Sequence, residues 1–166
     1  TPQGIVAVVQ KEEVGQADFN QGKFLFLEDV QDPGNVGTII RTADAAGFTG
    51  VIVSDKSADI YSLKTLRSMQ GSHFHLPIYR MSSQALLEEA KKAGIPVLAT
   101  TLSKDSKDYR DLPRLDQFVL VMGNEGQGIS PLMVESADQL VHISMKGQAE
   151  SLNVAVAAGI LIFHLS

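Results

Sequence analysis

The sequence has no cysteine and no tryptophan among its 166 residues, and its 14 Lys and Arg are outnumbered by 19 Asp and Glu. Without cysteine, disulfides and thiolate metal sites are excluded, and a reducing cytoplasm is the compartment that we expect. The most apolar stretch, Val154 to Leu165, is about a dozen residues long, which suits a buried helix better than a membrane span. The opening residues 1–4 lack the basic and then apolar pattern of a signal peptide. Because the net charge is −5, binding of nucleic acid would need a local cluster of Lys and Arg or a segment outside this chain.

What the chain does have is material for one core, because 44% of its residues are hydrophobic. Short runs rich in Val, Ile and Phe alternate with helix-like segments, and several runs are apolar throughout, as is typical of parallel strands covered on both faces. This alternation predicts a single α/β domain with a mostly parallel sheet flanked by helices. The strands are expected at 4–10, 24–28, 51–54, 75–79, 96–102, 118–122 and 140–143, and the helices at 35–46, 61–69, 82–93, 131–137 and 151–164.

In such a sheet, ligands bind outside the carboxyl ends of the strands, which directs attention to the loops 29–35, 100–106, 123–130 and 144–151. In the first loop, Asn35 is expected to cap the following helix, and Gly37 in its first turn permits close approach by another chain or a ligand. Arg41 follows near the helix start, where the helix dipole does not favour a cation. Arg41 is therefore either aimed at a phosphate or at developing negative charge, or is a surface residue paired with Asp32 or Asp44; the spacing leaves both open.

The second loop has three glycines within six residues after a strand, which gives a ligand close access to the backbone. It is neither the GxGxxG fingerprint nor a P-loop, and its distinctive residue is Glu125. On its own, this loop favours a capping or solvated carboxylate over a functional one, and it also leaves open an unrelated nucleotide-binding domain.

The third loop leads into a helix that is apolar on nearly all sides, which indicates burial against the sheet and against a second subunit. Ser151 is expected to cap this helix, whereas ordinary capping does not explain the amide of Asn153. Elsewhere, His73 and His75 alternate onto one face of an expected strand, and without a third ligand nearby we interpret them as structural.

Together the three loops resemble the signature motifs of the SpoU (TrmH) family of RNA 2′-O-methyltransferases, in the SPOUT superfamily. Residues 35–43 resemble N-x-G-x-x-x-R-T-A, residues 122–129 resemble M-G-x-E-G-x-G-[IL], and residues 143–157 resemble I-P-M-x-G-x-x-x-S-L-N-V-[SA]-x-A. The motifs follow the family's order and spacing over nearly the whole chain. Ser144 stands where the family usually has proline.

The resemblance implies an α/β domain whose C-terminal segment forms a deep trefoil knot, with bent S-adenosylmethionine held in the knot largely by backbone groups. It also implies a homodimer, formed through the C-terminal helix, whose active sites combine residues of both subunits. The expected cofactor contacts are Thr100, Gly123, Ile143 and Leu152, and the expected RNA contacts are Lys64 and Arg67, three apart on one helix face.

The implied activity is methyl transfer from S-adenosylmethionine to a ribose 2′-hydroxyl of structured RNA, ribosomal RNA in preference to transfer RNA, with no metal. Because a guanidinium stays protonated, we expect Arg41 to anchor a phosphate and stabilise the developing alkoxide. Glu125 would orient Arg41 or relay the proton, and Asn35, Ser151 and Asn153 would position the nucleotide and Arg41. The alternatives are a tRNA 2′-O-methyltransferase and a non-catalytic module that binds S-adenosylmethionine or RNA.

Many members of the family carry an N-terminal substrate-binding domain similar to ribosomal protein L30e. The opening residues 3–7 resemble the junction between that domain and the catalytic one. We therefore expect residues 1–166 to be a catalytic domain, the C-terminal part of a longer protein that holds most of its RNA affinity elsewhere.

Overall fold

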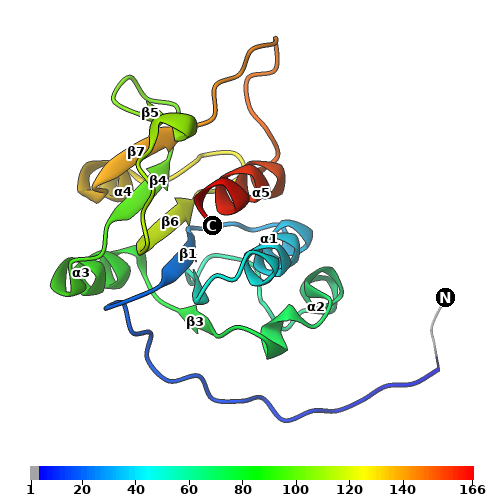
Figure 1. Cartoon of the computed structure of the whole chain (residues 1–166). Coiled ribbons are helices and arrows are strands. Elements are labelled where there is room, and N and C mark those ends of the chain that lie inside the picture. Colours follow the sequence, from blue (N-terminus) through cyan, green and yellow to red (C-terminus); the bar gives the residue numbers. More distant parts are fainter. Residues whose placement is uncertain (1–3) are drawn as a thin grey trace.

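A computed structural model of the chain describes residues 4–166, so the first residue of the expected junction, Gln3, lies outside the described residues. Within them, one parallel sheet runs in the order β3-β2-β1-β6-β4-β7-β5 (Figure 1). The strands are β1 (Lys23–Leu27), β2 (Gly50–Val53), β3 (Ile78–Arg80), β4 (Val97–Thr100), β5 (Lys107–Asp108), β6 (Phe118–Met122) and β7 (Gln139–His142). The helices are α1 (Pro33–Ala45), α2 (Leu63–Met69), α3 (Ser83–Ala93), α4 (Pro131–Ser136) and α5 (Val154–Leu165), with short 3₁₀ turns η1 (Ser72–Phe74) and η2 (Tyr109–Asp111).

The sheet is the middle of three layers, because successive side chains of each strand enter two different cores. Leu25 and Leu27 of β1 belong to the core that contains α1 and α5, whereas Phe24 and Phe26 belong to the core on the side of α3 and α4. Figure 1 shows α1 and α5 side by side on one face and α3 and α4 on the other. This confirms the expected α/β architecture, in which all paired strands are parallel.

Helix α1 begins earlier than expected, and its cap is Asp32, not Asn35. The Asp32 side chain accepts a hydrogen bond from the backbone N–H of Asn35 at 2.9 Å. Pro33 occupies the first turn, where its missing N–H costs no helical hydrogen bond. The Asn35 side chain is thereby left available for contacts with other loops.

The cap of α5 is also a different residue from the one expected. Asn153, not Ser151, accepts hydrogen bonds through Oδ1 from the backbone N–H groups of Ala155 (2.8 Å) and Val156 (3.2 Å). Ser151 lies two residues upstream in the loop. An amide is an effective cap, and it keeps its own N–H groups free to donate elsewhere.

Two strand predictions were wrong, and one strand was missed. Residues 4–10 form no strand and are exposed, Val8 to 98%, because a run of β-branched residues forms a strand only against a neighbouring strand, and within residues 4–166 these residues have none. The strand expected at 75–79 is confined to β3, so His73 and His75 lie in and after a 3₁₀ turn and share no strand face. The two-residue β5 was missed because its sequence, Lys-Asp, carries no apolar signal.

Helix α2 packs closely on α1 at a glycine. A Cβ on Gly37 would lie 2.4 Å from Cβ of Ser68 and 2.6 Å from the carbonyl oxygen of Thr65. The close approach expected at Gly37 is therefore made by α2.

Among residues 4–166, no helix has the length and apolar character needed to cross a membrane.

Candidate active site

The loops that follow β1, β4, β6 and β7 meet at one edge of the sheet, because these strands are parallel neighbours. Glu125, in the loop after β6, reaches across to the loop after β1. Its carboxylate accepts hydrogen bonds from the backbone N–H groups of Gln31 (3.2 Å) and Asp32 (3.0 Å) and from Nδ2 of Asn35 (3.4 Å). Glu125 thus fixes the start of α1, the helix that carries Arg41.

These contacts also set the charge of the carboxyl group. Partial burial acts to raise the pKa of Glu125, but the backbone N–H groups of Asp32, Glu125 itself and Gln31, with the Asn35 amide, bring its pKa below the ordinary value. At neutral pH the group is therefore a carboxylate that only accepts hydrogen bonds.

The third loop joins the same network through an amide pair. Nδ2 of Asn153 donates to Oδ1 of Asn35 at 3.2 Å, while Oδ1 of Asn153 caps α5. The chain Glu125–Asn35–Asn153 therefore connects the three motif loops by side-chain hydrogen bonds. Sequence reasoning singled out all three residues, but it did not foresee that they contact one another.

A cavity of about 350 Å³ lies between the loops after β4, β6 and β7. Its wall includes all four expected cofactor contacts, Thr100, Gly123, Ile143 and Leu152, and its floor includes Val154, Ala157 and Leu161 of α5. Its lining combines loop backbone with apolar side chains. The structure thus brings together the residues expected to hold the cofactor.

Gly123 is required by the turn that closes this cavity. A Cβ on Gly123 would lie 2.5 Å from the backbone carbon of Gly128 and from the nitrogen of Ile129. The turn is held by paired backbone hydrogen bonds between Asn124 and Gly128 (2.9 and 3.1 Å), and the Asn124 amide donates to the carbonyl of Asp29 at 2.8 Å. Asn124, which the motif analysis did not single out, is therefore a second tie between the β6 and β1 loops.

A polar hollow adjoins the cavity. It is lined by the loop 31–35, Glu125 and residues 151–154, and it shares Glu125, Ser151, Leu152 and Val154 with the cavity. Ser151 is exposed between the two. A small molecule in the cavity and a polar substrate in the hollow would therefore be neighbours.

Arg41 is exposed on α1 and lines neither space. The ion pairs that its spacing left open are not formed, because Asp32 caps α1 and Asp44 pairs with Nδ1 of His75 at 2.9 Å. Within residues 4–166, no hydrogen bond or ion pair joins Arg41 to Glu125. Among the residues that the structure describes, Arg41 therefore has no ion-pair partner and is a surface cation on the helix that follows the site loop.

Lys64 and Arg67 are exposed on α2, the neighbour of α1. Cε of Lys64 lies 3.6 Å from where a Cβ on Gly34 would be, so this side chain reaches over the start of α1. Lys64 therefore borders the loop 29–35, whereas Arg67 lies one turn further along the helix.

Beneath the loops lies a buried carboxylate that sequence reasoning assigned only to a strand end. Glu28, 2% exposed, accepts hydrogen bonds from Ser83 Oγ (2.5 Å), Ser130 N (2.6 Å) and Ser130 Oγ (2.9 Å). It thereby joins the end of β1 to the starts of α3 and α4. A charged residue directly after the apolar run Phe24–Leu27 was the available signal.

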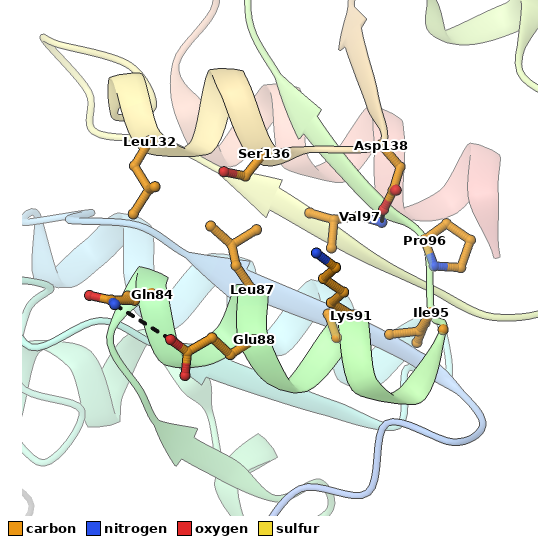
Figure 2. A pocket seen from close by; sticks show the side chains of 12 residues that line it. Gln84, Leu87, Glu88, Lys91, Ile95, Pro96, Val97, Leu132, Ser136 and Asp138 are labelled. Carbon is orange, nitrogen blue, oxygen red and sulfur yellow. Dashed lines mark hydrogen bonds between the residues drawn. The ribbon is translucent and has the colours of Figure 1, made fainter.

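A larger hollow, about 730 Å³, lies between α3 and α4 (Figure 2). It is at the amino ends of β4 and β7, the edge away from the motif loops. Both of its carboxylates already accept hydrogen bonds: Asp138 from the backbone N–H of Val97 at 2.7 Å, and Glu88 from Gln84 at 3.4 Å. Neither its position nor its contacts favour it as the active site.

Comparison with known proteins agrees with the motif loops. Residues 22–163 match the model of the SpoU rRNA Methylase family. The chain is 46% identical over 165 residues to the 23S rRNA (guanosine(2553)-2′-O)-methyltransferase RlmP of Bacillus subtilis, covering 99% of this chain and 65% of that protein.

Solved structures give the same result. An AdoMet-bound rRNA methyltransferase from Sinorhizobium meliloti superposes with a TM-score of 0.82 at 42% identity, covering 86% of this chain and 55% of the other. The TrmH/SpoU tRNA modifying enzyme of A. aeolicus superposes with a TM-score of 0.77 at 38% identity, covering 86% of this chain and 73% of the other. The chain thus spans somewhat less than two thirds of the first of these relatives, and by its family match it belongs to the SpoU rRNA Methylase family.

Proposed function

We propose that this chain carries the catalytic site of an RNA 2′-O-methyltransferase that uses S-adenosylmethionine and acts on ribosomal RNA. The observation that supports this most directly is the hydrogen-bonded chain Glu125–Asn35–Asn153, which lies where the cavity and the polar hollow adjoin. Such an arrangement suits a reaction in which a small donor and a polar acceptor must be held side by side.

The cavity fits the proposed methyl donor. Its volume of about 350 Å³ is within the roughly 300–1,000 Å³ usual for small-molecule sites. Gly123 allows the turn that forms one wall of the cavity to fold back closely on itself, because a Cβ there would meet the backbone of Gly128 and Ile129 at 2.5 Å. Thr100, Gly123, Ile143 and Leu152 would hold S-adenosylmethionine, which supplies a methyl group made electrophilic by its sulfonium sulfur.

The chain's own residues would align and activate the ribose hydroxyl. The donor would supply the methyl group to the 2′-oxygen and leave as S-adenosylhomocysteine, and the hydroxyl proton would pass to water. We assign Arg41 to anchoring an RNA phosphate and stabilising negative charge on the ribose oxygen. Glu125 acts on Arg41 through the loop that begins α1, and Asn35, Ser151 and Asn153 line the hollow that would receive the nucleotide.

We further propose that the site is completed in a homodimer. Arg41 does not line the hollow of its own chain, and α5, beside α1, exposes Val156 (53%) and Phe163 (56%) to solvent. A helix that is apolar on its outer side is stabilised when a second surface covers it. A second copy packed on α1 and α5 would bring its Arg41 towards the hollow of the first.

The C-terminal deep trefoil knot is proposed on the resemblance together with two contacts. Tyr109, in the segment after β5, packs edge-on against His164 of α5 with ring centroids 4.8 Å apart. Tyr109 and Leu112 also pack against the core cluster that contains α5. The segment between β4 and β6 therefore lies against the helix that follows β7, as a threaded segment must.

The RNA partner is proposed from the relatives. The B. subtilis relative is described as acting on 23S rRNA, whereas the A. aeolicus neighbour keeps transfer RNA as a second candidate. Lys64 and Arg67 would contact phosphate beside the hollow. Because the net charge is −5, we also propose that a further, L30e-like part of the whole protein supplies much of the RNA affinity.

The test is methyl transfer to ribosomal and transfer RNA with Arg41→Ala and, as matched control, Arg114→Ala, an exposed arginine in the segment that leads into the amino end of β6. We expect Arg41→Ala to lower the transfer rate by about 100-fold or more while leaving S-adenosylmethionine affinity unchanged, with Arg114→Ala unaffected in both. Unchanged transfer in Arg41→Ala would contradict the assignment. In the whole protein, cofactor binding without transfer to any RNA would favour the non-catalytic module.

A further inference from the structure

A second polar network lies outside the cavity, at the loop between β7 and α5. Ile143 and Met145 both line the cavity, whereas Ser144 between them is exposed and does not. Ser144 Oγ instead donates to Oδ2 of Asp108 at 2.6 Å. The loop is thus attached to β5 from outside, at the residue between two that face the cavity.

The acceptor of this bond is held rigidly. Oδ1 of Asp108 accepts from Nε of Arg110 at 2.8 Å and Oδ2 from a terminal guanidinium nitrogen at 2.9 Å. The hydrogen bonds from the Arg110 side chain and from Ser144 hold the pKa of Asp108 far below its usual range, so the acceptor stays ionised. In the β5–β7 ladder Asp108 lies beside His142.

His142 extends the network to the loop after β4. Its Nδ1 lies 2.8 Å from Ser106 Oγ and its Nε2 lies 3.2 Å from Ser144 Oγ. Ser106 donates its own hydrogen to the Ser103 carbonyl at 2.6 Å, and Ser144 donates to Asp108, so both hydroxyls face the ring as acceptors. A neutral imidazole has one N–H, so the His142 ring can donate to Ser106 or to Ser144 but not to both. The hydrogen bond from Ser144 to Asp108 forms in either tautomer of the ring.

The hydrogen bond between Ser144 and Asp108 fixes a loop that has few other contacts. Residues 143–153 have no regular secondary structure, and residues 146–153 are exposed, so the loop has little packing to fix its path. A charge-assisted hydrogen bond from Ser144 to Asp108 of β5 restricts the path of the loop at this position.

We propose that Ser144 is a positioning residue for the methyl-donor cavity, holding Ile143 and Met145 against it through Asp108. This inference rests on the proposed function for the identity of the ligand. A loop that occupies its binding conformation only part of the time weakens apparent affinity in proportion. The effect should therefore appear in cofactor binding and not in global stability.

The experiment compares Ser144→Ala, Ser144→Thr and the control Ser136→Ala in the whole chain. Ser136 is exposed at the end of α4 and lines only the α3–α4 hollow. Calorimetry with S-adenosylmethionine gives Kd, amide hydrogen exchange without ligand reports on 143–150, and thermal unfolding gives Tm. We expect Ser144→Ala to weaken binding about threefold to tenfold, the ordinary worth of one hydrogen bond, and to speed exchange in 143–150 at unchanged Tm.

Ser144→Thr keeps the hydroxyl and should bind like the wild type, as should Ser136→Ala. If Ser144→Ala binds the cofactor within twofold of the wild type, or if the threonine variant is as weak as the alanine variant, the proposal is overturned. Wild-type chain that does not bind S-adenosylmethionine would instead overturn the proposed function, and this inference with it.

Discussion

Replacing Gly123 with alanine tests whether the turn after β6 builds the cofactor site. The new Cβ would meet Gly128 and Ile129 backbone atoms at 2.5 Å, and these contacts must lengthen to about 3.4 Å before they are ordinary. Because backbone cannot rotate aside as a side-chain end can, the turn must move away from β6. Overpacking of this kind costs about 1–3 kcal/mol.

If the turn relieves the strain by opening, S-adenosylmethionine affinity should fall by roughly 5-fold to 150-fold, since each 1.4 kcal/mol is about tenfold. Gly126→Ala is the matched control, because its Cβ would meet only Oδ1 of Asn124, at 3.6 Å. Calorimetry measures Kd, and urea unfolding shows whether part of the strain lowers the free energy of unfolding. A Gly123→Ala protein that binds and unfolds as Gly126→Ala does would refute the reasoning.

Two further predictions concern carboxylates. Glu28→Gln should lower the free energy of unfolding by about 1–3 kcal/mol in urea, because an amide cannot accept all the bonds that Ser83 and Ser130 donate; an equal loss in the exposed control Glu135→Gln would argue against this. Because folding lowers the pKa of Glu125, its stabilising contribution is full above the ordinary glutamate value of 4.5 and is lost as pH falls through the lower folded value. The difference in free energy of unfolding between wild type and Glu125→Gln should accordingly shrink as the pH falls from 7 to below 4.5. A difference that grows with acidity would contradict the lowered pKa of Glu125.

The elements with strong apolar patterns could be predicted from the sequence nearly to the residue. Phe118–Met122 was expected at 118–122, and α3 at 82–93 differs from the observed helix by one residue. β6 buries every one of its side chains and α3 buries Leu86 and Ala90 on one face, so in both segments the local apolar pattern and the tertiary environment agree. The meeting of the motif loops at one edge followed from the parallel order alone.

What could not be predicted depends on partners distant in sequence. The pairs Glu125–Asn35 and Ser144–Asp108 join residues 90 and 36 positions apart, and no local pattern specifies them. The predicted helix caps were wrong for a related reason. Near Asp32 and near Asn153 the sequence has a second residue equally suited to cap the helix, and Pro33 and the path of the loop determine which residue does so. β5 owes its existence to the edge of β7 and not to its own two polar residues.

The C-terminal end of α5 is a position where a label can be attached without blocking the cavity. Nζ of Lys23, at the start of β1, donates to the carbonyl oxygen of Leu165 at 3.1 Å, so the helix finishes at the edge of the sheet opposite the motif loops. The five residues of β1 separate those edges by roughly 17 Å. A fluorophore attached at Ser166 would therefore leave the cavity open to titrated ligands, whereas a label in 146–150, beside the cavity residues Met145 and Ser151, would obstruct it.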